Sequence, residues 1–278
     1  MTTQATRRSV TTAQVVSLRD GQVRHGTDAL AGEEPLEIRA AGPGQTPVRV
    51  AVTMRTPGHD FALAAGFVIT EGLVAPEAIE AVAYCEDLDA QRYNVVTVRT
   101  RTPFDLGIAE RHFFATSSCG ICGKAALEAI TVRCAPLAPG PSVAAARLLE
   151  MPDALRAGQR VFDRTGGLHA AGLFDADGAL CLLREDVGRH NAVDKVVGAM
   201  ALGTGSRGEV LLVSGRLSFE IVQKAAVARV PIICAISAPS SLAVQAAEEL
   251  GVTAIGFLRP GGLNIYAHPE RVDLGSAQ

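Results

Sequence analysis

Apolar and polar positions alternate through most of the first hundred residues, which is typical of half-buried β-strands. Residues 48–54 alternate in this way, and short apolar groups before them, separated by turn formers, predict an N-terminal strand pair on an antiparallel sheet. Apolar residues then recur at helical spacing over residues 61–71, with Asp60 as the expected N-cap. A shorter helix at residues 76–82 and a strand at residues 95–101 complete a predicted α+β segment.

Regular alternation of strands and helices begins near residue 161. The predicted strands cover residues 161–164, 170–174, 179–184, 210–213, 232–236 and 253–258, and the predicted helices lie at residues 193–200, 219–228 and 242–250. This order predicts a mostly parallel sheet with helices on both faces, in which ligands bind where the strands end. Before it, the Pro- and Gly-rich residues 135–141 are expected to be a linker that leads into a helix at residues 143–157, with a break near Pro152.

The length of 278 residues fits about two domains, which we place at residues 1–140 and 141–278. Hydrophobic residues make up 48% of the chain, which excludes a disordered protein. Lysine and arginine number 26 against 29 acidic residues, and aromatic residues reach only 4%, so no nucleic-acid partner is expected. Neither a secretory signal nor an apolar stretch long enough to span a bilayer is found, so we expect a cytoplasmic protein with no membrane partner.

The sharpest chemical feature is the Cys119-x-x-Cys122 pair, which ends a polar loop at a predicted helix start. Helix N-H groups and the cation of Lys124 favour a nucleophilic thiolate there. Three interpretations stay open: a sulfur-carrying or redox-reactive cysteine, a thioredoxin-like dithiol, and a zinc site. The zinc site would have to recruit Cys134 and His112 at unusual spacing, because the chain has no second CxxC pair.

Basic residues gather where the predicted strands end or helices begin, positions that favour phosphate binding. They are Arg164, Arg184, Arg189, Lys195, Arg216, Lys224 and Arg259. Ordinary surface ion pairing explains any single one of them equally well. Their clustering at loop ends is what favours an anionic ligand.

Histidines and the isolated cysteines offer weaker signals. His169 and His190 are candidate acid/base groups, although a hydrogen-bonded histidine in a Gly-rich turn is the commoner arrangement. His59 is a candidate helix cap. Cys181 and Cys234 fall inside predicted strands, where we expect small buried side chains.

Taken together, the motifs resemble a known family, the formate dehydrogenase accessory sulfurtransferases (FdhD). The matching segments are Ser-Cys-Gly-Ile-Cys-Gly at residues 118–123, Thr-Gly-Gly-Leu-His at 165–169, and residues 184–195, 214–220, 237–243, 256–259 and 264–266. They occur in the family's order and span nearly the whole chain.

The resemblance implies a C-terminal cytidine deaminase-like α/β/α sandwich after an N-terminal α+β region. It also implies a cytosolic sulfurtransferase that receives persulfide sulfur from a cysteine desulfurase and passes it to the molybdenum (or tungsten) bis-molybdopterin guanine dinucleotide cofactor before insertion into formate dehydrogenase. Cys119 would form the persulfide, with Cys122 as its partner. A homodimer and no resident metal are further implications. The residues that would bind the guanine nucleotide part of the cofactor are Phe257, Leu258, Arg259, Pro260, Gly261 and Gly262.

Two competing hypotheses remain. The chain could be a non-catalytic chaperone that binds the metal-pterin cofactor while its cysteines are incidental, or a zinc-stabilised module. Replacement of Cys119 and Cys122 separates the chaperone from the sulfur carrier, and elemental analysis tests for zinc.

Overall fold

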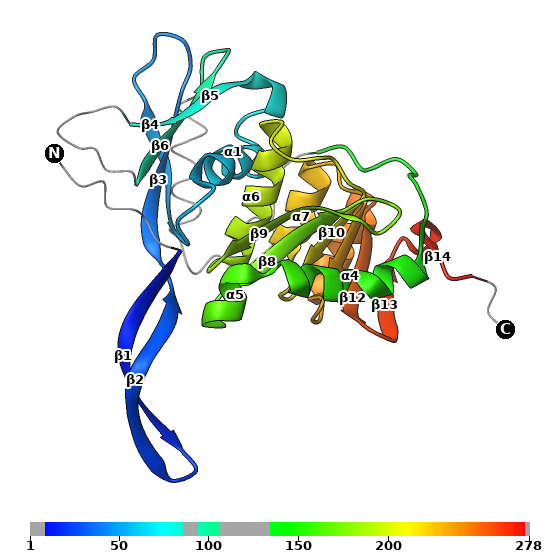
Figure 1. The fold of residues 1–278 in the computed structure, drawn as a ribbon. Coiled ribbons are helices and arrows are strands. Elements are labelled where there is room, and N and C mark those ends of the chain that lie inside the picture. The colour runs from blue at the N-terminus through cyan, green and yellow to red at the C-terminus, as the bar shows by residue number, and fades with distance from the viewer. Residues whose placement is uncertain (1–8, 86–93, 106–133, 276–278) are drawn as a thin grey trace.

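The structure is a computed structural model, and it describes residues 9–85, 94–105 and 134–275. The Cys119-x-x-Cys122 pair and the helix predicted to start there lie outside these residues. None of the described helices is long and apolar enough to span a lipid bilayer. The described residues form a protruding hairpin, an N-terminal sheet and a larger C-terminal sheet with its helices (Figure 1).

The N-terminal part confirms the predicted antiparallel strand pair and adds a second sheet. The hairpin consists of β1 (Val10–Arg19) and β2 (Gln22–Ala31), which pair only with each other. A four-stranded sheet in the order β4-β3-β6-β5 is built from β3 (Glu34–Ala41), β4 (Val48–Arg55), β5 (Ile79–Tyr84) and β6 (Val95–Thr100). Helix α1 (Asp60–Thr70) packs on this sheet through buried apolar residues.

The C-terminal part is a six-stranded sheet in the order β13-β12-β11-β10-β8-β9. Its strands are β8 (His169–Phe174), β9 (Leu180–Asp186), β10 (Val210–Val213), β11 (Ile232–Ala235), β12 (Thr253–Arg259) and β13 (Gly262–Ala267). The central strands β10, β11 and β12 are parallel, whereas β8, β9 and β13 are antiparallel to their neighbours. The predicted α/β class is confirmed, but the sheet is mixed and not mostly parallel, because only its two central pairings are parallel.

Helices cover both faces of this sheet, as predicted. Helices α6 (Arg189–Ala201), α7 (Phe219–Val227) and α8 (Ser241–Leu250) share one apolar cluster with α1, while α4 (Ala145–Gly158) packs on the opposite face. The remaining short elements are α5 (Arg160–Thr165), the 3-10 turns η1 (Pro76–Ala78) and η3 (Pro269–Arg271), and the parallel pair β7 (Val143–Ala144) and β14 (Val272–Asp273). The division at residue 140 stays a prediction, because the cluster containing α1 runs continuously into the C-terminal sheet.

Two predicted elements are wrong, and long-range contacts explain both. The helix expected at residues 76–82 is only the turn η1, because the chain extends from Ile79 to pair with β6. The strand expected at residues 161–164 is helix α5. The carboxylate of Glu185 on β9 accepts hydrogen bonds from the N-H groups of Val161 and Phe162 at 3.0 and 2.8 Å, so it caps this helix from a distant strand.

Two local details also differ from expectation. Asp60 is not the N-cap of α1; His59 occupies that position with a φ of 57° and no side-chain cap bond. The Asp60 carboxylate instead accepts two hydrogen bonds from the buried Arg55 guanidinium, at 3.0 and 2.9 Å. Pro152 lies inside α4, and the helix continues past it to Gly158.

Helices α1 and α6 cross with their backbones almost in contact. A Cβ atom on Gly66 would lie 1.8 Å from the carbonyl oxygen of Asp194, and one on Gly198 would lie 1.8 Å from the carbonyl oxygen of Ala62. Real Cβ atoms do not approach backbone so closely, so only glycine fits at either position. The crossing joins the N-terminal sheet to the C-terminal sheet through one shared core (Figure 1).

We expect Gly198→Ala to destabilise the protein by about 3 kcal/mol or more, because the added methyl group forces α1 and α6 apart. Gly140→Ala is the matched control, since its nearest neighbour would be 3.6 Å away, and it should change the free energy of unfolding by less than about 0.5 kcal/mol. Urea unfolding of both variants measures the difference. Equal stability of the two variants would contradict the close crossing.

Candidate anion-binding site

The carboxyl ends of the three parallel strands meet at one edge of the C-terminal sheet, where their loops bond to one another. In the loop after β10, Leu217 N-H donates to the Ala238 carbonyl at 3.1 Å and its own carbonyl accepts from Ser240 N-H at 2.9 Å. From β12, Phe257 N-H donates to the Ser237 carbonyl at 3.1 Å. Ser240 also caps α8, accepting from Ala243 N-H at 3.2 Å. These hydrogen bonds hold the three loops against one another at this edge of the sheet.

Basic side chains from neighbouring elements lie at this edge. His169 begins β8 and Arg189 begins α6, and both border Gly215 of the loop after β10. A Cβ atom on Gly215 would lie 3.5 Å from His169 Nδ1 and 3.8 Å from Arg189 Cδ, so glycine leaves this position open. The Nε atoms of Arg184 and Arg189 are buried and have no hydrogen-bond partner among the described residues. Two guanidinium groups therefore retain unused donors.

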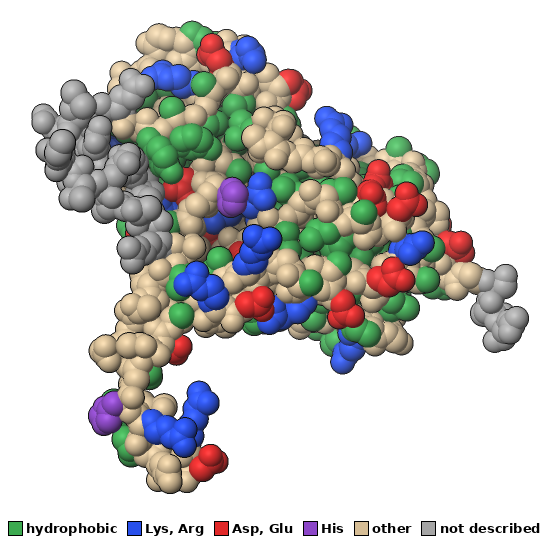
Figure 2. Space-filling view, viewed as in Figure 1, with side chains coloured by type: hydrophobic (Ala, Val, Ile, Leu, Met, Phe, Trp, Pro, Cys, Tyr) green, Lys and Arg blue, Asp and Glu red, His purple; other side chains and the backbone are tan. Residues whose placement is uncertain are grey.

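Burial and nearby cations both act on the histidines near this edge. Burial lowers the pKa of His169, and the charge of Arg189 lowers it further. Burial likewise lowers the pKa of His59 at the start of α1, helped by the charges of Arg184 and Lys195. Burial thus holds both imidazoles towards the neutral form and neighbouring cations add to it, so an anion bound here would offset the cationic part of the effect. Figure 2 shows Lys, Arg and His side chains near one another in a hollow of the molecular face.

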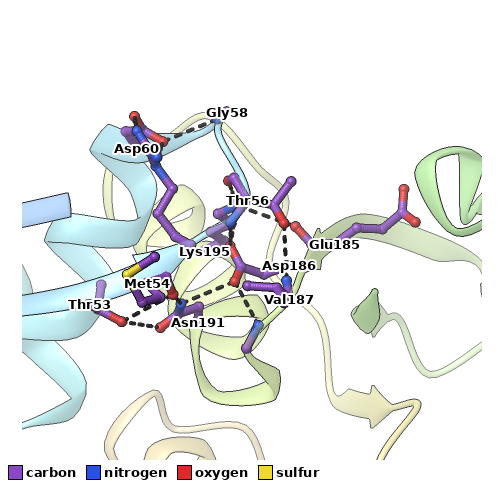
Figure 3. Close-up of polar contacts among 12 residues, drawn as sticks. Thr53, Met54, Thr56, Gly58, Asp60, Glu185, Asp186, Val187, Asn191 and Lys195 are labelled. Carbon is purple, nitrogen blue, oxygen red and sulfur yellow. Dashed lines mark hydrogen bonds and ion pairs between the residues drawn. The ribbon is translucent and has the colours of Figure 1, made fainter. Parts of the chain in front are cut away.

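A buried network around Asp186 sets the position of the adjoining strand end and helix (Figure 3). The Asp186 carboxylate contacts Lys195 Nζ at 2.6 Å and accepts from Gly188 N-H at 2.8 Å and Asn191 Nδ2 at 3.1 Å. It also accepts from Thr56 N-H at 3.2 Å, which ties it to the N-terminal part. The network fixes the segment between Asp186 and Asn191, which carries Arg189 and His190.

Lys195 and Lys224 are not available to an anionic ligand, in contrast to the sequence-based expectation. Lys195 is fully buried against Asp186 and donates to the Thr56 carbonyl at 2.8 Å. Lys224 contacts Asp194 at 2.9 Å and Glu71 at 2.8 Å. Burial acts to lower the pKa of Lys224, but its two carboxylate neighbours outweigh burial and raise the pKa, so it stays charged. Both lysines serve the fold.

The other arginine and histidine candidates lie in different environments. Arg164 is exposed on α5, and Arg216 and Arg259 are exposed near the loops of the edge. The Nε2 atom of His190 lies 2.8 Å from the Glu220 carboxylate, and this contact lowers the pKa of Glu220.

The residues that the resemblance assigns to the cofactor lie in the β12–β13 hairpin, from the end of β12 to the first residue of β13. Phe257, Arg259, Pro260, Gly261 and Gly262 line an open pocket of about 490 Å³, together with Leu263 and Asn264. Phe257 and Gly261 have positive φ angles of 52° and 87°, which bend the turn. Leu258 instead is buried in the core beneath the sheet, so its side chain does not line the pocket.

The described cysteines lie outside the predicted reactive pair. Cys85, Cys134, Cys181 and Cys234 are free thiols, and burial raises the pKa of each of the last three. Cys234 is fully buried, as predicted, whereas Cys181 is only partly buried. Within the described ranges no cluster of His, Cys, Asp and Glu could hold a metal ion. Cys119 and Cys122, the predicted reactive pair, fall outside these ranges.

Sequence reasoning missed the contribution of Gly215 and the unpaired donors of Arg184 and Arg189. In the sequence, Gly215 is only the middle residue of a Ser-Gly-Arg segment that follows a predicted strand. Its role depends on which side chains reach it from β8 and α6, and spacing along the chain does not contain that information.

Comparisons with known proteins point to one family. Residues 31–273 match the sequence model of the FdhD/NarQ family. Sulfur carrier protein FdhD of Streptomyces coelicolor is 51% identical over 95% of this chain and 96% of its own length. Sulfur carrier protein FdhD of Thermoplasma acidophilum is 41% identical over 92% of this chain and 90% of its own length. The crystal structure of a candidate formate dehydrogenase accessory protein from Desulfotalea psychrophila superposes with a TM-score of 0.73 at 25% identity, covering 96% of this chain and 100% of that one.

We expect Lys195→Met to destabilise the protein by about 3–5 kcal/mol, because it leaves the Asp186 carboxylate buried without its counter-ion. Arg147→Met, which breaks the exposed pair with Glu150, should cost less than about 1 kcal/mol and serves as the control. Chemical unfolding of both variants measures the two effects. If the Lys195 variant were as stable as the control, the Asp186 network would not hold the edge in place.

Proposed function

The chain belongs to the FdhD/NarQ family, and on this premise we propose that it is a sulfurtransferase that carries sulfur for formate dehydrogenase. In this proposal Cys119 accepts persulfide sulfur from a cysteine desulfurase, and Cys122 assists its transfer or release. The sulfur passes to the molybdenum bis-molybdopterin guanine dinucleotide cofactor before the cofactor is inserted into formate dehydrogenase. The match of residues 31–273 to the family is the observation that carries this proposal.

The proposed sulfur step is a thiol exchange. The Cys119 thiolate attacks the terminal sulfur of the donor persulfide, a new sulfur–sulfur bond forms on Cys119, and the donor cysteine leaves as a thiolate. No oxidant is needed, because one persulfide is broken for each one formed. Lys124, five residues after Cys119, is a nearby cation in the sequence that favours the thiolate.

The electropositive edge supports the binding of the cofactor as a client. Its guanine dinucleotide arms carry diphosphates, which need cationic and N-H donors in a site that water does not fully screen. We propose that the side chains of Arg184 and Arg189, whose buried Nε atoms have no hydrogen-bond partner among the described residues, supply these donors beside the open position at Gly215. The open pocket at the β12–β13 hairpin is our candidate for a guanine base or ribose.

Partners and assembly are part of the same proposal. We propose a cysteine desulfurase as the donor, formate dehydrogenase as the recipient, and a homodimer as the working unit. Sulfur exchange on Cys119 does not require the second copy, so the two parts of the proposal can fail separately.

We expect incubation with a cysteine desulfurase and cysteine to add about 32 Da per sulfur atom to the wild-type protein, and reductant to remove it. Cys119→Ala should lose this gain, and Cys181→Ala, which replaces a partly buried thiol on β9, should keep it. Intact-protein mass spectrometry makes the measurement.

Complementation of a strain that lacks the protein distinguishes the chaperone alternative. If Cys119→Ala restored formate dehydrogenase activity while cofactor binding stayed normal, the chain would be a chaperone and Cys119 would have no role in transfer. Loss of activity with normal cofactor binding supports the sulfur carrier.

We expect GDP, used as a probe of the diphosphate site, to raise the pKa of His169, because a bound anion offsets the charge of Arg189. Linkage then requires GDP affinity to increase as pH falls between the bound and free pKa values of His169. NMR titration of the histidines measures both. His268, which pairs with Glu270 near the opposite end of β12, is the internal control and should not respond.

Arg189→Gln should weaken GDP binding about tenfold, because a charged donor is lost. Arg147→Gln, an exposed substitution on α4 across the sheet, should leave the affinity unchanged. Calorimetry of the two variants makes the comparison, and equal affinities would place the diphosphate elsewhere.

A further inference from the structure

The candidate anion-binding site contains a carboxylate, that of Glu220, which a purely anionic ligand does not explain. Glu220 lies in the first turn of α7, directly after the loop that carries Gly215. Its Oε2 atom lies 2.8 Å from Nε2 of His190, the residue that follows Arg189 in α6. The charges of Arg189 and His190 act on both Glu220 and His169. The carboxylate is therefore a part of the same site.

This carboxylate keeps its negative charge. The hydrogen bond with His190 lowers the pKa of Glu220, and the charges of His190, Lys224 and Arg189 lower it further, which together outweigh the effect of burial. A fixed negative charge repels a phosphate group. Its place beside Arg189 favours a ligand that offers hydrogen-bond donors in addition to its anionic group.

Glu220 has acceptor capacity left for such donors. Its side chain is 53% exposed, and among the residues that the structure describes only Oε2 has a partner, His190. An ionised carboxylate has about four lone-pair sites, so both oxygens are able to accept from a ligand at the same time. Two adjacent acceptors match a planar ring that presents two neighbouring N-H donors.

Donors lie next to these acceptors at the start of α7. Ser218 is the N-cap residue of this helix, but its side chain accepts no hydrogen bond from the helix. The Oγ atom of Ser218 is buried and has no partner among the described residues. The first N-H groups of a helix have no partner within it, so they too are available. The start of α7 thus offers two acceptors beside a donor.

We propose that Glu220 determines the specificity of the site by recognising the 2-amino-4-oxopyrimidine edge that guanine and pterin rings share. The ring N-H donates to one carboxylate oxygen and the amino group donates to the other. The adjoining ring carbonyl accepts from the start of α7. Hydrogen bonds to a charged group are stronger than those between neutral groups, so this contact discriminates between rings.

The inference rests on the proposed function, which supplies a cofactor with two guanine and two pterin rings. The β12–β13 hairpin and Glu220 are therefore able to hold different rings of one cofactor. The diphosphate prediction concerns Arg189 and His169, whereas this inference concerns only the ring. The two are tested by different substitutions.

A change of ring preference is the test. Glu220→Gln replaces two acceptors by one acceptor and one donor, which matches a ring with a carbonyl in place of the amino group. That exchange turns guanine into xanthine and pterin into lumazine. The ligand pairs are therefore GDP with xanthosine diphosphate, and pterin with lumazine. Calorimetry measures all four affinities for the wild type and the variant.

In at least one pair, we expect the wild type to bind the amino ring at least about tenfold more tightly, and Glu220→Gln to prefer the carbonyl ring. The pair that shows the reversal identifies the ring as guanine or pterin. A merely structural role of Glu220 would weaken both members of a pair alike. Reversal therefore reports on direct contact with the ring.

Glu248→Gln is the matched control. Glu248 is also a half-exposed glutamate beside a histidine, with its carboxylate 3.7 Å from His268 Nε2, but it lies near the end of α8, away from the site. This variant should keep the preferences of the wild type. Circular dichroism checks that both variants are folded.

Preferences that Glu220→Gln leaves unchanged in both pairs would overturn the inference. So would a wild type that binds both members of each pair equally, or that binds none of the four ligands. If Cys119 gained sulfur while these preferences stayed unchanged, ring recognition alone would fail. If the preference reversed but Cys119 gained no sulfur, ring recognition would stand and the sulfur-transfer proposal would fail.

Discussion

The contact on which the rest of the structure depends is the crossing of α1 over α6 at Gly66 and Gly198. Side chains are absent at the point of contact, so the two helix backbones meet directly and leave no room for adjustment. One helix belongs to the N-terminal sheet and the other to the C-terminal sheet, and a single apolar cluster runs through both. The relative position of the two sheets therefore follows from two residues with no side chain.

Buried charges lie around this crossing, and they connect the same two parts. Asp186 and Lys195 reach Thr56, and Asp194 and Lys224 reach Thr70 and Glu71. A buried charge is costly unless it is paired, so each pair disfavours any arrangement that separates its members. These contacts add specificity to a crossing that the close packing of the two helices already restricts. They also fix the start of α6, and with it Arg189.

The candidate anion-binding site depends on which basic residues are paired with carboxylates and which are not. Lys195 and Lys224 are neutralised by carboxylates and are enclosed in the fold, whereas Arg184 and Arg189 keep donors unused at the edge of the sheet. Local charge is thus positive in a chain whose formal net charge is −3. A protein of this kind can bind a polyanionic cofactor at one place without attracting nucleic acid over its whole surface.

Periodicity along the chain determined most of the elements, because the strands from β8 to β12 and the helices α6 to α8 bury faces whose spacing is visible in one dimension. The Cys119-x-x-Cys122 pair and the motifs that indicate the family are equally local. Three-dimensional contacts alone decided the rest. Glu185 made residues 160–165 a helix, pairing with β6 made residues 79–84 a strand, and carboxylates from distant helices and strands removed two lysines from the candidate site. In each case the deciding partner lies outside the segment itself, and burial made its contact strong enough to override local preference.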